Sequence, residues 1–480
     1  MGTKSPVLVF RSTPLRRYHF RSGLRKNRHM RETPDAMPPS DVLLGPSPRA
    51  RILILAAQDD LAGGLSDGLD GLGWQTVTAR SVEAAERAVS DMAIEGIIVD
   101  ARTGYPPGLA VRLKAAAGPR RVPVVLLGGH DNDADLHMTP PVHPAQAALR
   151  LEHLVRAAVA SEEFELRRET FKDQGVDLTP APSQVVRRVL VVGEPDPRFL
   201  ALANVLESAD VELTAALTPY TAFDYLHERE FDAVLLWGGA RRTEALSIAA
   251  GIKRNTRLYH LPVVLYLGSD ADISLDEVFG RGVADVASPD TPIEETAQRV
   301  LALADAYRRH QTIREILERA RNSGLMDPAT GLFTRELFAS HLARLAAAST
   351  KRHRPLSVCV LRVASEEGVD QARAGGWVDR AMPQIGAMIS RLVRSEDTAA
   401  RLAPEVFAVA LPATRLGEAR LVSERIAAVI GCTAFHAGED RTPFVVTFNI
   451  GEAERLPDES PMSLLERAAQ AAEKATEPVG

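Results

Sequence analysis

The sequence has few of the features that would point to a secreted scaffold or a metalloprotein. Its 480 residues contain only two cysteines, Cys359 and Cys432, which are far apart and lie in apolar surroundings. Such cysteines are expected to pack as small apolar side chains rather than to form a disulfide, as is usual in a reducing cytoplasm. We therefore expect a cytoplasmic protein without a bound metal.

Long apolar runs and a strong net charge are also missing. No uninterrupted apolar segment approaches the roughly 20 residues that a membrane-spanning helix needs, so no membrane span is expected. The formal net charge is only −6, which gives no reason to expect a nucleic-acid partner. Hydrophobic residues make up 45% of the chain, as in ordinary globular proteins, and the length suits about three domains of roughly 150 residues.

Residues 1–49 differ in composition from the rest. Between Lys4 and Arg31 they carry many basic residues, almost no acidic ones and no helical or strand period. We expect a disordered basic leader, which translation from Met30 or Met37 would largely omit. A targeting peptide is the alternative.

Short apolar strands alternate with helical segments in two successive copies. Continuous apolar strands separated by helices indicate a parallel sheet that is covered on both faces. The matching spacing suggests a weak internal duplication. The pattern resembles the flavodoxin-like receiver domains of response regulators, over residues 50–160 and 187–305, joined by a linker at 161–186. The six strand-like runs are residues 51–55, 96–99 and 122–127, then 188–192, 231–236 and 261–265.

The resemblance implies a phosphorylated aspartate at the end of the third strand of a receiver, beside a Mg²⁺ ion. In the first copy this position is Asp100, a possible phosphoacceptor. The expected acidic pair falls on Ala56-Ala57, with Asp59 and Asp60 a little further on, and Gly128 replaces a hydroxyl residue. An aspartate without its metal ligands is a weak acceptor, because two anions meet unneutralised.

The second copy departs further from the receiver pattern. Trp237 occupies the acceptor position, and Leu267 and Pro289 replace polar partners. Since tryptophan cannot be phosphorylated, we expect this degenerate receiver to serve as a packing or dimerisation module. Apolar residues at helical spacing continue beyond it and predict a stalk helix over residues 306–325. This helix either pairs with a second copy in a homodimer or lies on its own chain.

Two motifs in the last part of the chain resemble GGDEF domains. Residues 327–335, DPATGLFTR, are similar to the opening signature D-x-L-T-G-L-x-N-R, and residues 401–409, RLAPEVFAV, occupy the hairpin that names the family. Strand-like segments at 356–363 and 444–450 lie on either side. The resemblance implies that residues 326–480 form a GGDEF-type α+β domain with a mixed or antiparallel sheet.

Active members of this family join two GTP molecules into cyclic di-GMP. The paired glycines that approach the triphosphate are here Ala403 and Pro404, and acidic positions are occupied by Arg362 and Val406. Proline also removes a backbone donor. From these differences we expect a degenerate domain that is not an enzyme.

Several substrate-site positions keep acidic residues. Glu405 remains at an acidic position of the hairpin, Asp370 stands where the family has asparagine, and Asp379 stands at another guanine contact. Two alternatives follow from them. The chain is either a weak or residual cyclase that binds GTP through Glu405 and Asp379, or a receiver scaffold that works without a nucleotide.

A product-binding motif of the family is intact. Residues 394–397, RSED, match the R-x-x-D motif five residues before the hairpin signature, and Arg425 matches a secondary contact. An arginine fork can bond guanine O6 and N7, and a carboxylate can accept from guanine N–H groups. We therefore expect Arg394, Asp397 and Arg425 to bind cyclic di-GMP. A surface ion pair at i and i+3 is the alternative.

The layout of two receivers and a degenerate GGDEF domain resembles inactive members of the response-regulator family. That likeness implies a cyclic di-GMP effector at the cell pole. It also implies two protein partners, an adaptor and a cell-cycle regulator that is delivered to the ClpXP protease.

Overall fold

The computed structural model describes residues 51–475 except 103, 130, 141, 179–185, 239–241, 256, 268–274 and 439–441. The expected leader, residues 1–49, lies outside the described residues. Within these ranges, no helix is long and apolar enough to cross a membrane. The described chain folds into three successive α/β parts, each built around its own sheet.

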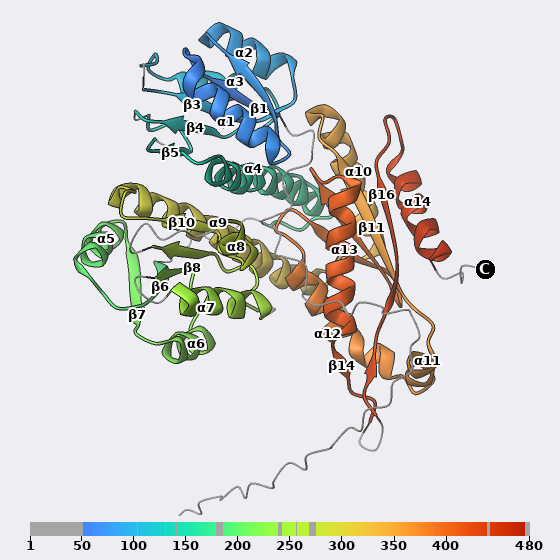
Figure 1. Ribbon diagram of the computed structural model, residues 1–480. Coiled ribbons are helices and arrows are strands. Elements are labelled where there is room, and N and C mark those ends of the chain that lie inside the picture. Colours follow the sequence, from blue (N-terminus) through green and yellow to red (C-terminus); the bar gives the residue numbers. More distant parts are fainter. Residues whose placement is uncertain are drawn as a thin grey trace, which may run out of the picture. The chain divides into compact units, whose positions relative to one another are not determined.

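The first part is a five-stranded parallel sheet with the strand order β2-β1-β3-β4-β5, and its strands alternate with helices along the chain (Figure 1). Helices α1 and α4 pack on one face, and α2 and α3 pack on the other. The elements are β1 (Arg51–Leu55), α1 (Asp59–Gly71), β2 (Gln75–Ala79), α2 (Val82–Asp91), β3 (Ile94–Asp100), α3 (Leu109–Ala116), β4 (Val124–Leu127), β5 (Leu136–Met138) and α4 (Pro144–Asp173).

The second part repeats this architecture, with the order β10-β9-β8-β6-β7 and parallel pairing throughout. Helices α6, α7 and α8 cover one face, whereas α5 and α9 cover the other. The elements are β6 (Arg187–Val192), α5 (Pro197–Ser208), β7 (Val211–Ala216), α6 (Pro219–Glu228), β8 (Ala233–Trp237), α7 (Arg242–Arg254), β9 (Val263–Tyr266), α8 (Leu275–Gly280), β10 (Asp285–Ala287), α9 (Ile293–Arg319) and the 3₁₀ helix η1 (Ala320–Ser323).

The third part has an antiparallel sheet in the order β12-β13-β11-β16 and a separate β14-β15 pair. Alternate residues of β11 face opposite layers, with Cys359 and Leu361 toward α12 and α13, and Val358 and Val360 toward α10 and α14. The elements are α10 (Arg335–Arg352), β11 (Leu356–Val363), α11 (Glu367–Ala374), α12 (Trp377–Leu392), β12 (Thr398–Ala403), β13 (Val406–Pro412), α13 (Leu416–Gly431), β14 (Ala434–Phe435), β15 (Phe444–Val445), β16 (Phe448–Glu454) and α14 (Pro461–Lys474).

These sheets confirm the predicted fold class of two parallel receiver-like domains followed by an antiparallel GGDEF-type domain. The strand expected over residues 444–450 is interrupted. Residues 444–445 pair with β14, whereas the segment that begins at Phe448 pairs with β11 and continues to Glu454.

Helix α4 runs through the first half of the segment that the sequence assigned to a linker. It continues without a break to Asp173, because Phe171 near its end is fully buried and packs edge-on against Phe333, with 5.4 Å between ring centroids. The helix therefore begins on the first sheet and ends in the core of the third part. The domain boundaries at residues 160 and 186 stay predictions.

Helix α9 covers most of the predicted stalk and also contacts two cores. Val300 and Ala304 are fully buried against the second sheet, and Ile316 is buried in the core that contains α10. Pairing of this segment with a second copy in a homodimer stays a prediction. The apolar residues named here are covered without a second copy.

A cluster of buried charges joins α4 to the second part of the chain. Arg150 of α4 donates to Asp285 of β10 at 3.3 Å, and both side chains are only 4% exposed. Glu295 and Arg299 of α9 complete the cluster through an ion pair with each other. Since an isolated buried charge is costly, these four side chains depend on one another.

We expect Arg150→Ala to lower the free energy of unfolding by about 3–5 kcal/mol, because it leaves buried carboxylates without a partner. The matched control is Arg112→Ala, which breaks the exposed pair between Arg112 and Glu86 and should cost less than about 1 kcal/mol. Chemical denaturation measures both effects. Equal losses in the two variants would contradict the structural role of the cluster.

Candidate ligand site around Arg394

The R-x-x-D motif forms a closed turn between α12 and β12. The backbone N–H of Arg394 donates to Oδ2 of Asp397 at 2.9 Å, and the N–H of Asp397 donates back to the Arg394 carbonyl at 3.2 Å. Asp397 is only 3% exposed, whereas Arg394 is half-buried. The alternative of a simple surface pair therefore does not describe this motif, because its carboxylate lies inside the protein.

Glu396, a middle residue of the motif, is also buried and is held by α4. Arg156 donates from Nη1 to Oε1 of Glu396 at 2.9 Å. Burial acts to raise the pKa of Glu396, but attraction to Arg156 and Arg394 outweighs burial and leaves this pKa below its ordinary value. Glu396 is therefore an anion that the two arginines stabilise.

The pKa of Asp397 is shifted in the opposite direction to that of Glu396. Burial, followed by repulsion from Glu396, raises the pKa of Asp397 from 3.8 to about 6. The folded protein therefore keeps this proton at pH values where the unfolded chain has lost it. Between these two pKa values, the contribution of Asp397 to stability falls as the pH rises.

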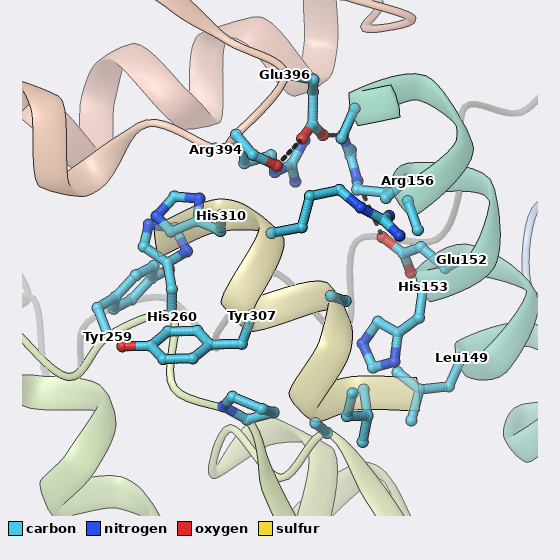
Figure 2. Close-up of a pocket in the computed structure, with 18 of the residues that line it drawn as sticks. Leu149, Glu152, His153, Arg156, Tyr259, His260, Tyr307, His310, Arg394 and Glu396 are labelled. Atoms are coloured by element: carbon cyan, nitrogen blue, oxygen red, sulfur yellow. Dashed lines mark hydrogen bonds and ion pairs between the residues drawn. The ribbon is translucent and has the colours of Figure 1, made fainter. Parts of the chain in front are cut away.

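A cavity of about 250 Å³ opens beside the turn. Figure 2 shows Arg394 and Glu396 at one end, α4 with Arg156 along one side, and Tyr307 with His310 from α9. Its lining combines cations with aromatic rings, a set that suits a flat anionic ligand. The cations are Arg156, Lys253, Arg309 and Arg394, the rings are those of His153, Tyr259, His260, Tyr307 and His310, and the acidic residues are Glu152 and Glu396.

A second cavity, of about 380 Å³, touches the other side of the same turn. Asp397 and His310 both line it, and both are more than nine-tenths buried. Among the described residues, Oδ1 of Asp397 and Nε2 of His310 have no hydrogen-bond partner. An unmet buried acceptor is costly, so the Asp397 oxygen is a place where a ligand N–H group would be stabilised.

The structure places Arg425 of α13 near this turn but binds it to other groups. Its guanidinium donates to the Tyr259 hydroxyl and to the Leu392 carbonyl, both at 3.1 Å. It also lies over the Tyr259 ring, 5.3 Å from the centroid. The predicted secondary contact therefore joins the third part of the chain to the loop before β9.

The substrate-site residues lie on the β12–β13 hairpin and the helices near it. Glu405 at the hairpin turn accepts two hydrogen bonds from Arg373 of α11, at 2.8 and 2.7 Å. Arg362 near the end of β11 pairs with Glu473 of α14 at 2.9 Å. Asp379 is exposed on α12. The hairpin thus keeps its carboxylate, but an arginine of the chain already binds it.

The donors at this hairpin do not fit a preformed Mg²⁺ site. Mg²⁺ prefers several oxygen ligands, including carboxylates, whereas Arg362 brings a cation and Arg373 occupies both oxygens of Glu405. In the part of the chain that the structure describes, no group of three or more His, Cys, Asp or Glu side chains is placed to hold a metal.

Asp100 lies at the end of β3, where the receiver pattern puts the phosphoacceptor. Its side chain is fully buried and accepts two hydrogen bonds from the guanidinium of Arg102, both at 2.9 Å. The Arg102 hydrogen bond, opposed by burial, leaves the pKa of Asp100 below its ordinary value. The carboxylate is therefore already neutralised by the neighbouring arginine.

In the second receiver-like domain, aromatic rings fill the corresponding place. Trp237 at the end of β8 stacks on Tyr266, with ring centroids 3.8 Å apart and planes 1° apart. Its indole N–H donates to Asp196 at 3.0 Å. Gly193 has a φ of 140°, and a Cβ there would meet the Trp237 carbonyl at 2.4 Å. The glycine is thus required by the close approach of the Trp237 backbone.

Sequence reasoning missed the residues that surround the Arg394 turn. Arg156, Tyr259 and His310 come from segments far from the motif in sequence, and nothing in their local pattern distinguishes them from ordinary surface or core residues. One clue in the sequence, the opposite charges of Glu163 and Arg167 at i and i+4 in α4, was misleading. That spacing is typical of an exposed helix face, whereas both residues are buried.

Comparisons with known proteins agree with this architecture. Residues 324–478 match the family described as "Diguanylate cyclase, GGDEF domain". The response regulator PleD of Caulobacter vibrioides is 22% identical over 400 residues, covering 80% of this chain and 87% of PleD. Diguanylate cyclase DgcP of Pseudomonas aeruginosa is 31% identical over 159 residues, covering 32% of this chain and 23% of DgcP.

Solved GGDEF domains are also similar to part of the chain. The GGDEF domain of DgcB from Caulobacter crescentus, solved in complex with c-di-GMP, is 23% identical. The matched region covers 32% of this chain and 89% of the DgcB chain, with a TM-score of 0.30.

The family match corrects one expectation. From Arg362, Pro404 and Val406 we expected that the chain is not an enzyme, and this expectation is wrong. The matched family is enzymatic and is described as diguanylate cyclase, and DgcP carries the same name. Residues 324–478 therefore match a GGDEF domain, two receiver-like domains precede it, and this architecture is similar to that of PleD.

Proposed function

We propose that this chain is a regulator that responds to cyclic di-GMP and binds it at the turn formed by Arg394 and Asp397. The observation that carries the proposal is the buried Oδ1 of Asp397, which lines a cavity and has no hydrogen-bond partner among the described residues. A guanine edge offers N–H donors to such an oxygen, and the Arg394 fork suits guanine O6 and N7.

The charge and shape of the neighbouring cavity support the same ligand. Cyclic di-GMP carries two phosphodiester anions and two flat bases. Lys253, Arg309 and Arg394 bring positive charge to the cavity wall, and Tyr259 and His260 bring ring faces on which a base can stack. Arg425 contributes indirectly, because it holds Tyr259 through its hydroxyl.

We expect cyclic di-GMP to raise the melting temperature of the protein, as any ligand of the folded state does. Arg394→Ala should weaken binding at least about tenfold, since a hydrogen bond to a charged group contributes about 1.5–3 kcal/mol. Arg425→Ala should weaken binding less. Calorimetric titration measures the affinities, and Arg420→Ala, at an exposed arginine of α13, is the control.

Arg394 is half-buried, so its loss is also expected to lower the melting temperature without ligand. The affinity must therefore be compared at a temperature where both proteins are folded. If the Arg394→Ala variant binds as tightly as the wild type, the ligand site lies elsewhere and the proposal is wrong.

A second candidate function is synthesis of cyclic di-GMP from GTP, which the diguanylate cyclase family match favours. This candidate predicts that product forms from GTP with added Mg²⁺ and that Glu405→Gln reduces it, because Glu405 fixes the hairpin turn through Arg373. Glu424→Gln, at an exposed position of α13, is the control. Chromatography of the nucleotides measures synthesis, and a wild-type protein that forms no product would remove this candidate.

For the first receiver-like domain we propose Asp100 as the phosphoacceptor. Acetyl phosphate should label Asp100 only, and Asp100→Asn should abolish the label. Arg102→Ala should increase it, because Arg102 binds both carboxylate oxygens. Mass spectrometry locates the phosphate. A label on the second receiver-like domain, where Trp237 stands at the acceptor position, would contradict the alignment of that domain.

From resemblance alone, we also propose the roles that the sequence suggested by its likeness to PopA, a GGDEF response regulator. These are a homodimer, a place at the cell pole, and partnership with an adaptor and with a cell-cycle regulator degraded by ClpXP. Co-purification of the adaptor with the wild type but not with the Arg394→Ala variant would tie these roles to the ligand.

A further inference from the structure

Helix α4 contacts the Arg394–Asp397 turn at two points. Arg156 donates from Nη1 to Glu396 at 2.9 Å. About three helical turns later, Arg167 donates from Nη2 to the Asp397 carbonyl at 3.1 Å and to the Thr398 hydroxyl at 3.0 Å. One rigid element of the first receiver-like domain therefore holds a side chain and the backbone of the ligand motif.

Arg167 is itself fixed in place. Its side chain is 2% exposed and pairs with Glu163 at 2.8 Å. Glu163 also contacts His341 of α10 at 2.9 Å. Because these groups are buried and hydrogen-bonded, a shift of Arg167 would also shift the turn to which it donates.

The other half of α4 is part of the first receiver-like domain. Ala147 and Leu151 are 1% exposed and pack on the face of the sheet that contains Ile52, Ile98 and Val125. If α4 shifted on this sheet, its contacts with the Arg394–Asp397 turn would shift as well, since the helix is continuous from the sheet to the turn.

We propose that Arg156 and Arg167 are positioning residues for the Arg394–Asp397 turn, through which the first receiver-like domain sets the affinity for cyclic di-GMP. The ligand part of this statement rests on the proposed function. The coupling is reciprocal, so a bound ligand also stabilises the contact of α4 with the turn.

The experiment uses the full chain and the variant Arg156→Ala. Arg156 is the better choice because its side chain is 26% exposed, whereas loss of the buried Arg167 endangers folding. Arg168→Ala is the control, since Arg168 lies on the same helix and is exposed. Arg156→Lys tests rescue, because an ammonium group can still pair with Glu396.

Two measurements separate this inference from the proposed function. Hydrogen exchange of the peptide that spans residues 393–398, without ligand, should be at least about threefold faster in Arg156→Ala. Calorimetric titration with cyclic di-GMP should show affinity that is weaker by between about 2-fold and 30-fold, the range of coupling through packed networks. Both effects should be absent in Arg168→Ala and largely reversed in Arg156→Lys.

Each outcome decides one claim. Unchanged exchange at residues 393–398 in the Arg156→Ala variant would overturn the positioning role, whether or not the protein binds the ligand. Faster exchange with unchanged affinity would overturn the control of affinity by the first receiver-like domain. A wild type that exchanges as expected but binds no cyclic di-GMP would overturn the proposed function and keep the positioning role.

Discussion

Charged side chains inside a protein must find partners, and helix α4 carries four of them. Arg150, Glu162, Glu163 and Arg167 are each at most 4% exposed. Arg150 is paired with Asp285 in the second receiver-like domain, and Glu162 is paired with Arg354 just before β11. Since breaking a buried pair costs about 3–5 kcal/mol, the position of this helix is set by partners that come from elsewhere in the chain.

The same rule applies at three carboxylates, which lie in the ligand motif, at the residual substrate site and at the phosphoacceptor position. Glu396 is bound by Arg156, Glu405 by Arg373 and Asp100 by Arg102. In each case an arginine of the chain supplies the positive charge next to the carboxylate. A cation or a phosphoryl donor that approaches these carboxylates has to compete with a bidentate or buried ion pair, and such pairs are strong and directional.

Much of the fold was predictable, whereas the surroundings of the site were not. The buried strands at residues 51–55 and 356–363 were predicted within their observed bounds, because short apolar runs between turn-forming residues are typical of buried strands. The Arg394–Asp397 motif was found by its residues. The burial of Asp397, the contacts of Arg156 and the extension of α4 were not found, since each depends on residues more than a hundred positions away. The prediction that the chain is not an enzyme was wrong, because it rested on single substitutions in the motifs, whereas residues 324–478 as a whole match the diguanylate cyclase family.

The continuity of α4 also has a consequence for synthesis of the chain. Arg167 is made 231 residues before its partner Thr398. At about 5–20 residues per second, that separation is a wait of roughly 10 to 45 seconds. During this interval Arg167 can pair with Glu163 of its own helix, but the Asp397 carbonyl and the Thr398 hydroxyl that it also bonds have not yet been made. The helix therefore finishes its packing only when nearly the whole chain has left the ribosome.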